Sequence, residues 1–270
     1  MLGANLPLKY GASGLGNVAY GLIMYELERV DSALRSFVSV QGALVMHTIF
    51  SYGSEEQKSH YLPKLAKGEL VGCFALTEHH GGSDPQALET TVRKEGDSFV
   101  ISGSKMWITN AKEADLFIIF ANANPDAGHR GITAFILERN TPGFSIGKKE
   151  DKLGIRASST CELTLDDCRV PASNILGNLG EGYKVAIQTL NEGRIGIAAQ
   201  MVGVAQGALD HALSYVQQRT QFGRPVGSFQ GVQFQLAQAT TELEAARLLT
   251  YNAARPVSYT HLTLPTNREV

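Results

Sequence analysis

The chain has 270 residues, of which 43% are hydrophobic and 19% charged, a balance that suits a globular protein and excludes a wholly disordered one. Its 24 Lys and Arg residues are nearly balanced by 26 Asp and Glu residues, so the net charge is −2. A charge this small argues against nucleic acid and against an anionic membrane surface as partners.

Cysteine usage and hydropathy exclude two further classes. The cysteines, Cys73, Cys161 and Cys168, are few and odd in number, which argues against a disulfide framework. No apolar run approaches the ~20 residues that span a bilayer, and residues 1–16 lack the basic start and apolar stretch of a signal peptide. We therefore expect neither membrane insertion nor a secretion signal.

The first 70 residues have a helical pattern. In the first segment, apolar residues recur at helical spacing beside charged ones: Val18, Leu22, Met24, Leu27 and Val30. A second run, from Phe37 to Ile49, is mostly apolar and predicts a more buried helix. Ser54 stands three residues before Gln57, as in a capping box. This predicts a third, short helix that runs to about Lys67 and is interrupted by Pro63.

From about residue 71 the pattern changes to short segments rich in Phe, Ile, Val and Thr, separated by Gly, Asn, Asp or Pro. The predicted strands are Ser98–Ile101, Lys105–Thr109, Leu116–Asn122, Gly131–Glu138 and Cys161–Asp166. Strands at this spacing favour an antiparallel barrel or sandwich over alternating β-α-β units.

Helical periodicity returns at Gly182. The apolar residues fall on one broad stripe, Ile187, Leu190, Ile197, Met201, Val204, Ala208, Leu209, Ala212 and Val216. A loop at Gln221–Pro225 breaks this helix, and a last helix runs from about Gly231 to Arg255. The order predicts an α+β fold with an N-terminal helical domain (1–70), a central β domain (71–181) and a C-terminal helical domain (182–255).

The first candidate site is the segment 74–85. An apolar strand runs into hydroxyl and carboxylate groups and then into Gly81 and Gly82, which let backbone N–H groups approach an anion closely. The alternative is an ordinary exit from a strand into a turn. His79 and His80 suggest a metal, but adjacent side chains on a strand point to opposite faces and no third ligand is in view. We therefore assign no metal ligand.

The second candidate is Trp107, the one tryptophan of the chain, which follows Gly103–Met106. A single Trp at the end of a strand is either part of the core or a flat platform for a cofactor. The core is the more common place for such a residue, and a position beside the Leu76–Glu78 segment would make the ring a platform with a hydroxyl at its edge.

Five blocks, in this order, resemble the acyl-CoA dehydrogenase family. They are Leu76–Glu78 with Gly82–Asp84, Lys105–Asn110, Leu153–Ser158, Asn191–Arg194 and Arg219–Gly223. Each is short, but the resemblance covers residues 1–255, and the family's order of helical, β and helical domains is the order read above. From about Gly131 onward the sequence is most similar to short-chain and short branched-chain members.

The resemblance implies an FAD enzyme that introduces an α,β double bond into an acyl-CoA. A carboxylate base removes the α proton, the flavin accepts the β hydrogen as hydride, and hydrogen bonds to the thioester carbonyl stabilise the developing enolate. It also implies a homotetramer or homodimer, an electron-transfer flavoprotein as acceptor, and a bacterial cytoplasmic or mitochondrial matrix location.

The resemblance implies roles for particular residues. Thr77 would donate to the flavin pyrimidine ring, Ser83 to the pyrophosphate or the acyl-CoA, and Trp107 would pack on the ring. The other flavin contacts would be Phe74, Ala75, Leu76, Gly82, Ile108 and Thr109, with Arg219, Phe222 and Gln230 reaching the FAD of a neighbouring subunit. The substrate contacts would be Ser83, Tyr183 and the turn Asn191, Glu192, Gly193 and Arg194.

The sequence departs from a working member of the family at the catalytic base. The Tyr-Glu-Gly stretch that carries the base in most members is absent. Some branched-chain members carry a Glu where this chain has Gly193, and Glu192 is one residue off, a rotation of ~100° on a helix. We therefore assign no catalytic residue. His79-His80 also replaces the small residues or proline usual in this loop.

The two ends of the sequence also depart from the family. Residues 256–270 resemble a translated sequencing adapter, with a natural divergent tail as the alternative, and Met1 reads as internal to a longer gene. We expect the 270-residue chain to be an inactive fragment of an active parent. The competing hypothesis is a non-catalytic flavin-binding or partner-binding fragment.

The substrate has one alternative. Residues 28–32 and 34–36 resemble glutaryl-CoA dehydrogenase, in which the positions matching Glu28, Arg35 and Ser36 help to hold the distal carboxylate of the substrate. A guanidinium can pair such a carboxylate bidentately. Arg35 could instead cap a helix or pair with Asp31 on the same face. Oxidative decarboxylation of glutaryl-CoA is therefore the alternative function.

Overall fold

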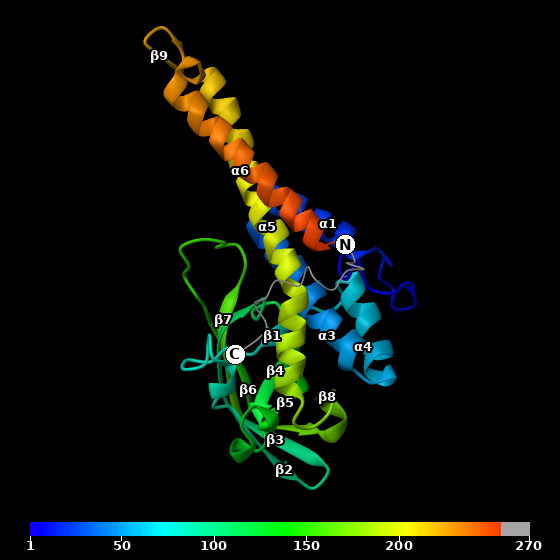
Figure 1. Cartoon of the computed structure of the whole chain (residues 1–270). Coiled ribbons are helices and arrows are strands. Elements are labelled where there is room, and N and C mark those ends of the chain that lie inside the picture. Colours follow the sequence, from blue (N-terminus) through cyan, green and yellow to red (C-terminus); the bar gives the residue numbers. More distant parts are fainter. Residues whose placement is uncertain (255–270) are drawn as a thin grey trace. The chain divides into compact units, whose positions relative to one another are not determined.

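The computed structural model describes residues 1–254, except for the side chain of Glu192 (Figure 1). The chain forms two compact units. Unit 1 consists of Met1–Leu15 and Ala33–Arg194, and unit 2 consists of Gly16–Ser32 and the described residues that follow Arg194. The adapter-like segment 256–270 lies outside the described residues.

The helical part of unit 1 precedes its sheet. Its elements are η1 (Leu8–Tyr10), α2 (Ser32–Ser39), η2 (Val40–Met46), α3 (His47–Tyr52) and α4 (Glu55–Lys67). The predicted helix Phe37–Ile49 is helical throughout, but η2 within it is a π-helix. The capping box is confirmed, because the backbone N–H of Gln57 donates to Ser54 Oγ (3.1 Å) and that of Ser54 to Gln57 Oε1 (3.0 Å). The predicted interruption at Pro63 is wrong, since α4 continues through it.

The helical stretch Ser32–Tyr52 corrects one expectation about hydropathy. By length and composition alone its 21 residues could cross a membrane, with a mean hydropathy of 1.2 in the most apolar window. Half of that window is buried in the protein, and a core helix has the same signature. Val45, Met46 and Ile49 belong to the main core cluster of unit 1.

The sheet of unit 1 is eight-stranded and mixed. Its strands are β1 (Gly72–Ala75), β2 (Thr91–Glu95), β3 (Ser98–Thr109), β4 (Leu116–Asn122), β5 (Ile132–Glu138), β6 (Phe144–Lys149), β7 (Thr160–Pro171) and β8 (Ile175–Leu176). The order is β6-β7-β3-β2-β4-β5-β8, and β1 pairs with β4. Most pairs are antiparallel, as the pattern predicted, but β1 and β2 each pair with β4 in parallel.

The strand boundaries differ from the prediction where a bulge or a connection intervenes. Leu116–Asn122 is confirmed residue for residue as β4. The two predicted strands Ser98–Ile101 and Lys105–Thr109 form the single strand β3, and the last predicted strand extends from Thr160 to Pro171. Short 3-10 turns connect the strands: η3 (Pro85–Ala87), η4 (Pro125–Gly131) and η5 (Ala172–Asn174).

The central strand β4 contributes to a core on each face of the sheet. Leu116, Ile118 and Phe120 pack into the cluster that includes the helices, and Phe117, Ile119 and Ala121 into the cluster formed with β3, β5 and β7. The same holds for β5, where Ile136 faces the first cluster and Leu137 the second. The period of two is present, but both faces are apolar because both are covered.

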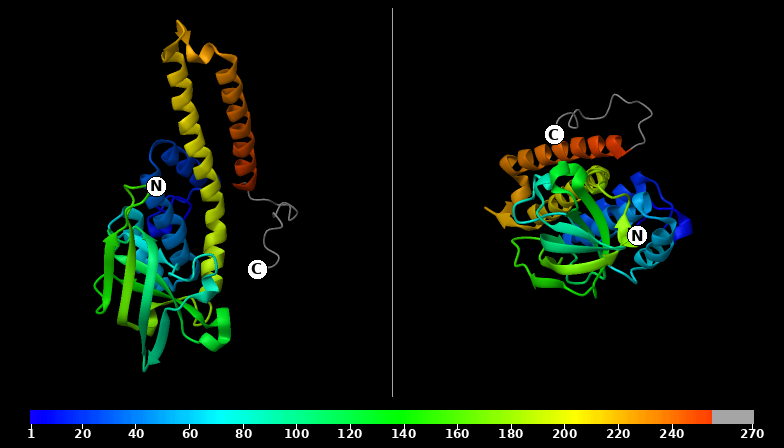
Figure 2. Two further views of the ribbon diagram at one scale, coloured as in Figure 1. Left: turned by 90° about the vertical axis from the view of Figure 1, so that its left-hand side faces the viewer. Right: turned by 90° about the horizontal axis from the view of Figure 1, so that it is seen from below.

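Unit 2 consists of helices and a hairpin. These are α1 (Asn17–Val30), the second half of α5 (Gly182–Gln218), β9 (Thr220–Gln221), β10 (Arg224–Pro225), η6 (Val226–Ser228) and α6 (Gln230–Ala254). After the hairpin, α6 returns alongside α5 (Figure 2). The predicted break at Gln221–Pro225 is confirmed as this hairpin.

The buried faces of α1 and α5 match the predicted stripes only in part, with Met24 and Leu209 buried. Val18, Leu22 and Val30 of α1, and Ile197, Met201 and Val204 of α5, are exposed in this structure. The helices meet through glycines instead: a Cβ on Gly203 would lie 2.4 Å from the carbonyl oxygen of Tyr25. Such close approach of two backbones excludes any larger residue there.

Candidate functional site

The end of β1 forms the first part of the site. Phe74 is half-buried and its ring packs against that of Phe120, with centroids 4.9 Å apart, and Ala75 is fully buried. Beyond the strand, Leu76 and Thr77 are half-buried in an irregular segment. These residues therefore line the inner end of the segment predicted to hold a ligand.

The loop after Glu78 is a tight turn. Glu78 and Gly81 exchange backbone hydrogen bonds of 3.1 and 3.3 Å. His79 and His80 lie in this turn with their rings edge to face, 4.7 Å between centroids, and not on a strand as the metal argument assumed. Gly82 and Ser83 follow and are exposed, and a Cβ on Gly82 would meet nothing within 4 Å.

A β-bulge presents Trp107. Lys105 pairs with Leu163 and Ile108 with Cys161, so two residues of β3 oppose one of β7 between them. Trp107 has a φ of +60°, an uncommon backbone conformation for a bulky residue, and is 56% exposed. The bulge turns this ring out of the sheet, while Ile108 next to it is buried. Trp107 is therefore a surface platform and not part of the core.

Backbone and side-chain bonds bring the two predicted segments together. The N–H of Met106 donates to the carbonyl oxygen of Thr77 (2.9 Å), and Cys73 Sγ donates to the carbonyl oxygen of Thr109 (3.1 Å). Within residues 1–254, the hydroxyls of Thr77, Thr109 and Ser83 have no hydrogen-bond partner. An exposed aromatic ring beside free hydroxyls can receive a flat polar ligand.

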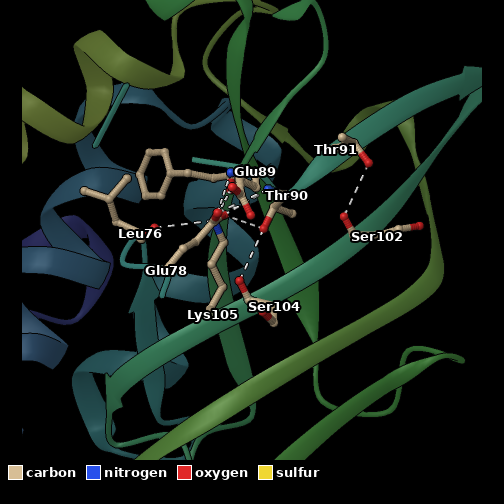
Figure 3. Close-up of polar contacts among 9 residues, drawn as sticks. Leu76, Glu78, Glu89, Thr90, Thr91, Ser102, Ser104 and Lys105 are labelled. Atoms are coloured by element: carbon tan, nitrogen blue, oxygen red, sulfur yellow. Dashed lines mark hydrogen bonds and ion pairs between the residues drawn. The ribbon is translucent and has the colours of Figure 1, made fainter. Parts of the chain in front are cut away.

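A buried ion pair lies next to this edge (Figure 3). Lys105 Nζ donates to Glu78 Oε1 over 2.6 Å, and the two side chains are 0% and 5% exposed. Burial lowers the pKa of Lys105 to about 8, opposed by the charge and hydrogen bond of Glu78. Burial would raise the pKa of Glu78, but the charge of Lys105 and hydrogen bonds from Lys105, Thr90 and Glu89 lower it below its ordinary range. Both groups are thus charged at neutral pH.

The sequence reasoning missed this pair, although it quoted both residues within its motifs. The two residues are 27 apart in the chain, and they meet only because the segment beyond β1 packs against β3, where the N–H of Met106 donates to the carbonyl oxygen of Thr77. The available signal was that Lys105 is the one charged residue of β3, because a fully buried lysine requires a partner.

Tyr183, predicted to contact a substrate, lines a cavity of about 620 Å³. Its hydroxyl accepts a 3.3 Å hydrogen bond from Gln86 Nε2, and its ring lies 5.4 Å from that of His129. Arg130 and Lys184 also line the cavity. Sequence reasoning missed these cationic neighbours, because His129 and Arg130 lie in a connection, η4, that carries no periodic pattern.

The predicted Asn191–Arg194 turn is part of helix α5, which corrects its conformation. Arg194 is exposed and its Nε donates to Asn191 Oδ1 (3.1 Å). A Cβ on Gly193 would lie 4.0 Å from Leu44 Cδ2, so this part of α5 passes close to η2. The side chain of Glu192 lies outside the described residues.

Three predicted residues lie in unit 2, on and beside the hairpin. Arg219 and Gln230 are exposed, and Phe222 is 93% exposed with a φ of +52°. The rings of Phe222 and Phe229 are edge to face with centroids 6.2 Å apart. Arg35, the residue of the glutaryl-CoA alternative, lies on α2 of unit 1 and is 5% exposed. Among the described residues no group of three or more His, Cys, Asp or Glu side chains could hold a metal.

Comparison with protein families gives matches along the chain. The acyl-CoA dehydrogenase N-terminal domain matches residues 1–69, the middle domain residues 73–168 and the C-terminal domain residues 180–266. The short/branched chain specific acyl-CoA dehydrogenase of Rattus norvegicus mitochondria is 50% identical over 257 residues, which are 95% of this chain and 59% of the relative. The chain therefore spans about three fifths of that relative's length.

Solved structures give the same result. Butyryl-CoA dehydrogenase from Megasphaera elsdenii has a TM-score of 0.91 and 44% sequence identity, over 94% of this chain and 67% of that one. The structure of the glutaryl-coenzyme A dehydrogenase glutaryl-CoA complex has a TM-score of 0.91 and 42% identity, over 94% of this chain and 65% of that one.

Proposed function

Because the chain belongs to the acyl-CoA dehydrogenase family, we propose that the whole protein carries out flavin-dependent α,β-dehydrogenation of a short or short branched-chain acyl-CoA. A bound flavin would supply the acceptor for the β hydrogen as hydride, and a carboxylate base would take the α hydrogen as a proton. The observation that carries the proposal is the edge of unit 1 where the exposed Trp107 ring and the free hydroxyls of Thr77 and Thr109 lie on two bonded segments.

The residues of this edge fit FAD, which would supply the hydride acceptor. The Thr77 hydroxyl would donate to the polar edge of the ring system and the Trp107 indole would pack against its face. The pyrophosphate would lie against Gly82 and Ser83. Both residues are exposed, and a Cβ on Gly82 would meet nothing within 4 Å. Thr109 would stand at the hydride-accepting side. Phe74, Ala75, Leu76 and Ile108 would form the apolar floor.

The cavity beside Tyr183 would hold the CoA portion of the substrate. Arg130, Lys184 and His129 line it, and guanidinium and ammonium groups pair well with phosphates. The Tyr183 hydroxyl, anchored by Gln86, would fix the orientation of the chain that leads away from those phosphates. Asn191, Gly193 and Arg194 on α5, with Ser83, would continue the contact toward the thioester.

The acyl group is proposed from the similarity of the sequence to short-chain and short branched-chain relatives. Glutaryl-CoA is the alternative substrate, and its basis is the resemblance at Glu28, Arg35 and Ser36, since a guanidinium can pair a carboxylate. This alternative has the weaker support, since the relatives that match at about 50% identity are named as short/branched-chain enzymes.

Contacts beyond one chain complete the proposal. Arg219, Phe222 and Gln230 would reach the FAD of a second subunit in a homodimer or homotetramer, which would cover the exposed Phe222 ring. Electrons would pass to an electron-transfer flavoprotein, in the bacterial cytoplasm or the mitochondrial matrix. No residue of this chain is proposed as the base, so the 270-residue chain alone would bind FAD without steady turnover.

One titration tests the flavin site. FAD is added to the purified 270-residue chain and the fluorescence of Trp107 is followed, because stacking on a flavin quenches an indole and the chain has one Trp. We expect saturable quenching that riboflavin, which lacks the pyrophosphate, reproduces only weakly. Thr77→Val should weaken FAD binding, and Thr141→Val, at a half-buried threonine on another loop, is the matched control. A Trp107 signal indifferent to FAD overturns the flavin site.

Dye reduction with butyryl-, 2-methylbutyryl- and glutaryl-CoA then separates the functions. Turnover with the first two by the whole protein supports the proposal, and preferential turnover of glutaryl-CoA supports the alternative. Flavin binding without any turnover of the three by the whole protein favours the non-catalytic binding role.

A further inference from the structure

The ammonium of Lys105 joins three segments inside the sheet of unit 1. It donates to Glu78 Oε1 (2.6 Å), to the carbonyl oxygen of Phe120 on β4 (2.5 Å) and to that of Leu76 (3.4 Å) (Figure 3). A lysine has three donors, and all three are used. The side chain that extends from β3 therefore fixes the positions of β4 and of the segment beyond β1 relative to its own strand.

The carboxylate of Glu78 is also fully engaged. It accepts from the backbone N–H of Thr90 (3.1 Å), from the Thr90 hydroxyl (2.5 Å) and from the backbone N–H of Glu89. Thr90 reaches it because β3 has a glycine opposite: a Cβ on Gly103 would lie 2.7 Å from Thr90 Oγ1 and 2.8 Å from Thr90 Cα. The pair thus belongs to a closed polar network in which every partner is satisfied.

Stability alone is a poor reason for such a network. Taking two charges out of water offsets most of their attraction, and apolar residues of similar volume are often as stable or more stable. What a satisfied buried network does supply is one defined geometry, because any shift leaves a buried charge without a partner. The question is which geometry this one defines.

The backbone next to the pair is strained, and it carries the candidate flavin contacts. Glu78 follows Thr77 directly, and Lys105 stands two residues before Trp107, whose φ of +60° is a strained backbone conformation for a non-glycine residue. Such strain persists only where the surroundings over-determine the backbone. Between the two, the N–H of Met106 donates to the Thr77 carbonyl oxygen.

We propose that the Glu78–Lys105 ion pair is a positioning device that holds the Trp107 bulge and the Thr77 segment in the one register that presents the ring and the hydroxyl together. Neither residue is exposed, so neither would touch the flavin or the substrate. The consequence for flavin binding rests on the function proposed above, whereas the consequence for the conformation of Trp107 does not.

The test uses a paired substitution, because Lys105→Met alone would leave Glu78 charged and buried. The variant Glu78→Gln/Lys105→Met removes both charges and keeps the volumes. The matched control is Arg93→Met, which removes a cation from the exposed pair with Asp167 (2.8 Å) on the same sheet. All are full 270-residue chains, each measured for thermal unfolding by circular dichroism, for acrylamide quenching of Trp107 without flavin, and for FAD affinity.

In the paired variant we expect unchanged cooperative unfolding, at least a twofold change in the acrylamide quenching constant of Trp107, and about a tenfold weaker FAD affinity, since small misplacements at a site lose binding in such steps. Arg93→Met should change none of the three. A paired variant with wild-type Trp107 quenching overturns the positioning role, and so does one that no longer folds, because the pair would then serve stability. If the wild-type chain binds no FAD, the proposed function fails, and the quenching comparison still decides the role of the pair.

Discussion

The backbone N–H of Met106 donates a 2.9 Å hydrogen bond to the carbonyl oxygen of Thr77, and this bond joins the two segments that carry the candidate flavin contacts. The segments are neighbours although 29 residues of sequence separate Thr77 from Met106. On either side of the bond stand a buried carboxylate, Glu78, and a buried ammonium, Lys105. The two segments are therefore joined twice, by this backbone bond and by the buried ion pair.

Breaking the ion pair from one side should cost far more than removing it. Lys105→Met should lower the free energy of unfolding of unit 1 by about 3–5 kcal/mol, because it leaves an uncompensated buried carboxylate. Adding Glu78→Gln should recover most of this loss. Urea unfolding of the wild type, both single variants and the double variant gives the coupling energy, and simple additivity of the two single effects would contradict the prediction.

Alkaline pH should reveal the displaced pKa of Lys105. Its pKa is lowered from the ordinary 10.5 to about 8 in the folded chain. Between these values the unfolded chain binds more protons, so this lysine makes stability rise with pH, by ~1.4 kcal/mol per pH unit at most. The comparison is between wild type and Glu78→Gln/Lys105→Met at each pH, because the thiols and phenols shared by both then cancel. A difference that stays constant from pH 8 to 10.5 would show that Lys105 titrates normally.

Gly103→Ala should destabilise unit 1 by about 1–3 kcal/mol, the usual range for overpacking. The new Cβ would lie within 2.9 Å of three atoms of Thr90, a residue whose backbone N–H and hydroxyl both donate to Glu78. Gly154→Ala is the matched control, since nothing lies within 4 Å of its Cβ position. Chemical denaturation of both variants checks this, and equal stabilities would argue against the close approach of β2 and β3.

Gly203→Ala should separate α1 from α5 in unit 2. The added methyl would stand 2.4 Å from the carbonyl oxygen of Tyr25, which is backbone and yields little. Gly231→Ala on α6 meets nothing within 4 Å and should be neutral or stabilising by up to ~1 kcal/mol, because alanine favours a helix. Thermal unfolding, followed by the circular dichroism of the helices, distinguishes the two variants. The close approach of α1 and α5 is contradicted if both variants shift the unfolding midpoint in the same direction by the same amount.

Local signals in the sequence predicted local structure. The Ser54–Gln57 capping box and the strand Leu116–Asn122 are confirmed because each is determined by residues within a few positions. The prediction of which face of α5 is buried failed for part of the helix, because its apolar residues form so broad a stripe that either side could be buried. Gly203 determines which side is buried, because it allows the Tyr25 backbone to approach. From the sequence alone, a glycine within a helix indicates only a locally less stable helix, because the neighbouring segment is not known.

The candidate site divides in the same way. The motif residues Thr77 and Trp107 were recognised one by one, and the structure places them on two segments joined by a backbone hydrogen bond. The bulge that exposes Trp107 depends on the register of β3 against β7, which no single segment encodes. The Glu78–Lys105 pair and the cationic lining around Tyr183 arise only when segments far apart in the chain meet.

The double burial of β4 has a consequence for how unit 1 opens. Six consecutive residues, from Leu116 to Ala121, are inaccessible to solvent, and the strand is bonded to β1, β2 and β5. Local fraying cannot expose the backbone of such a strand to solvent while the neighbouring strands stay in place. Its amide hydrogens should therefore exchange with solvent deuterium only when the whole unit unfolds. β4 would then be the last segment to exchange, and its exchange rate would report the global stability of the unit.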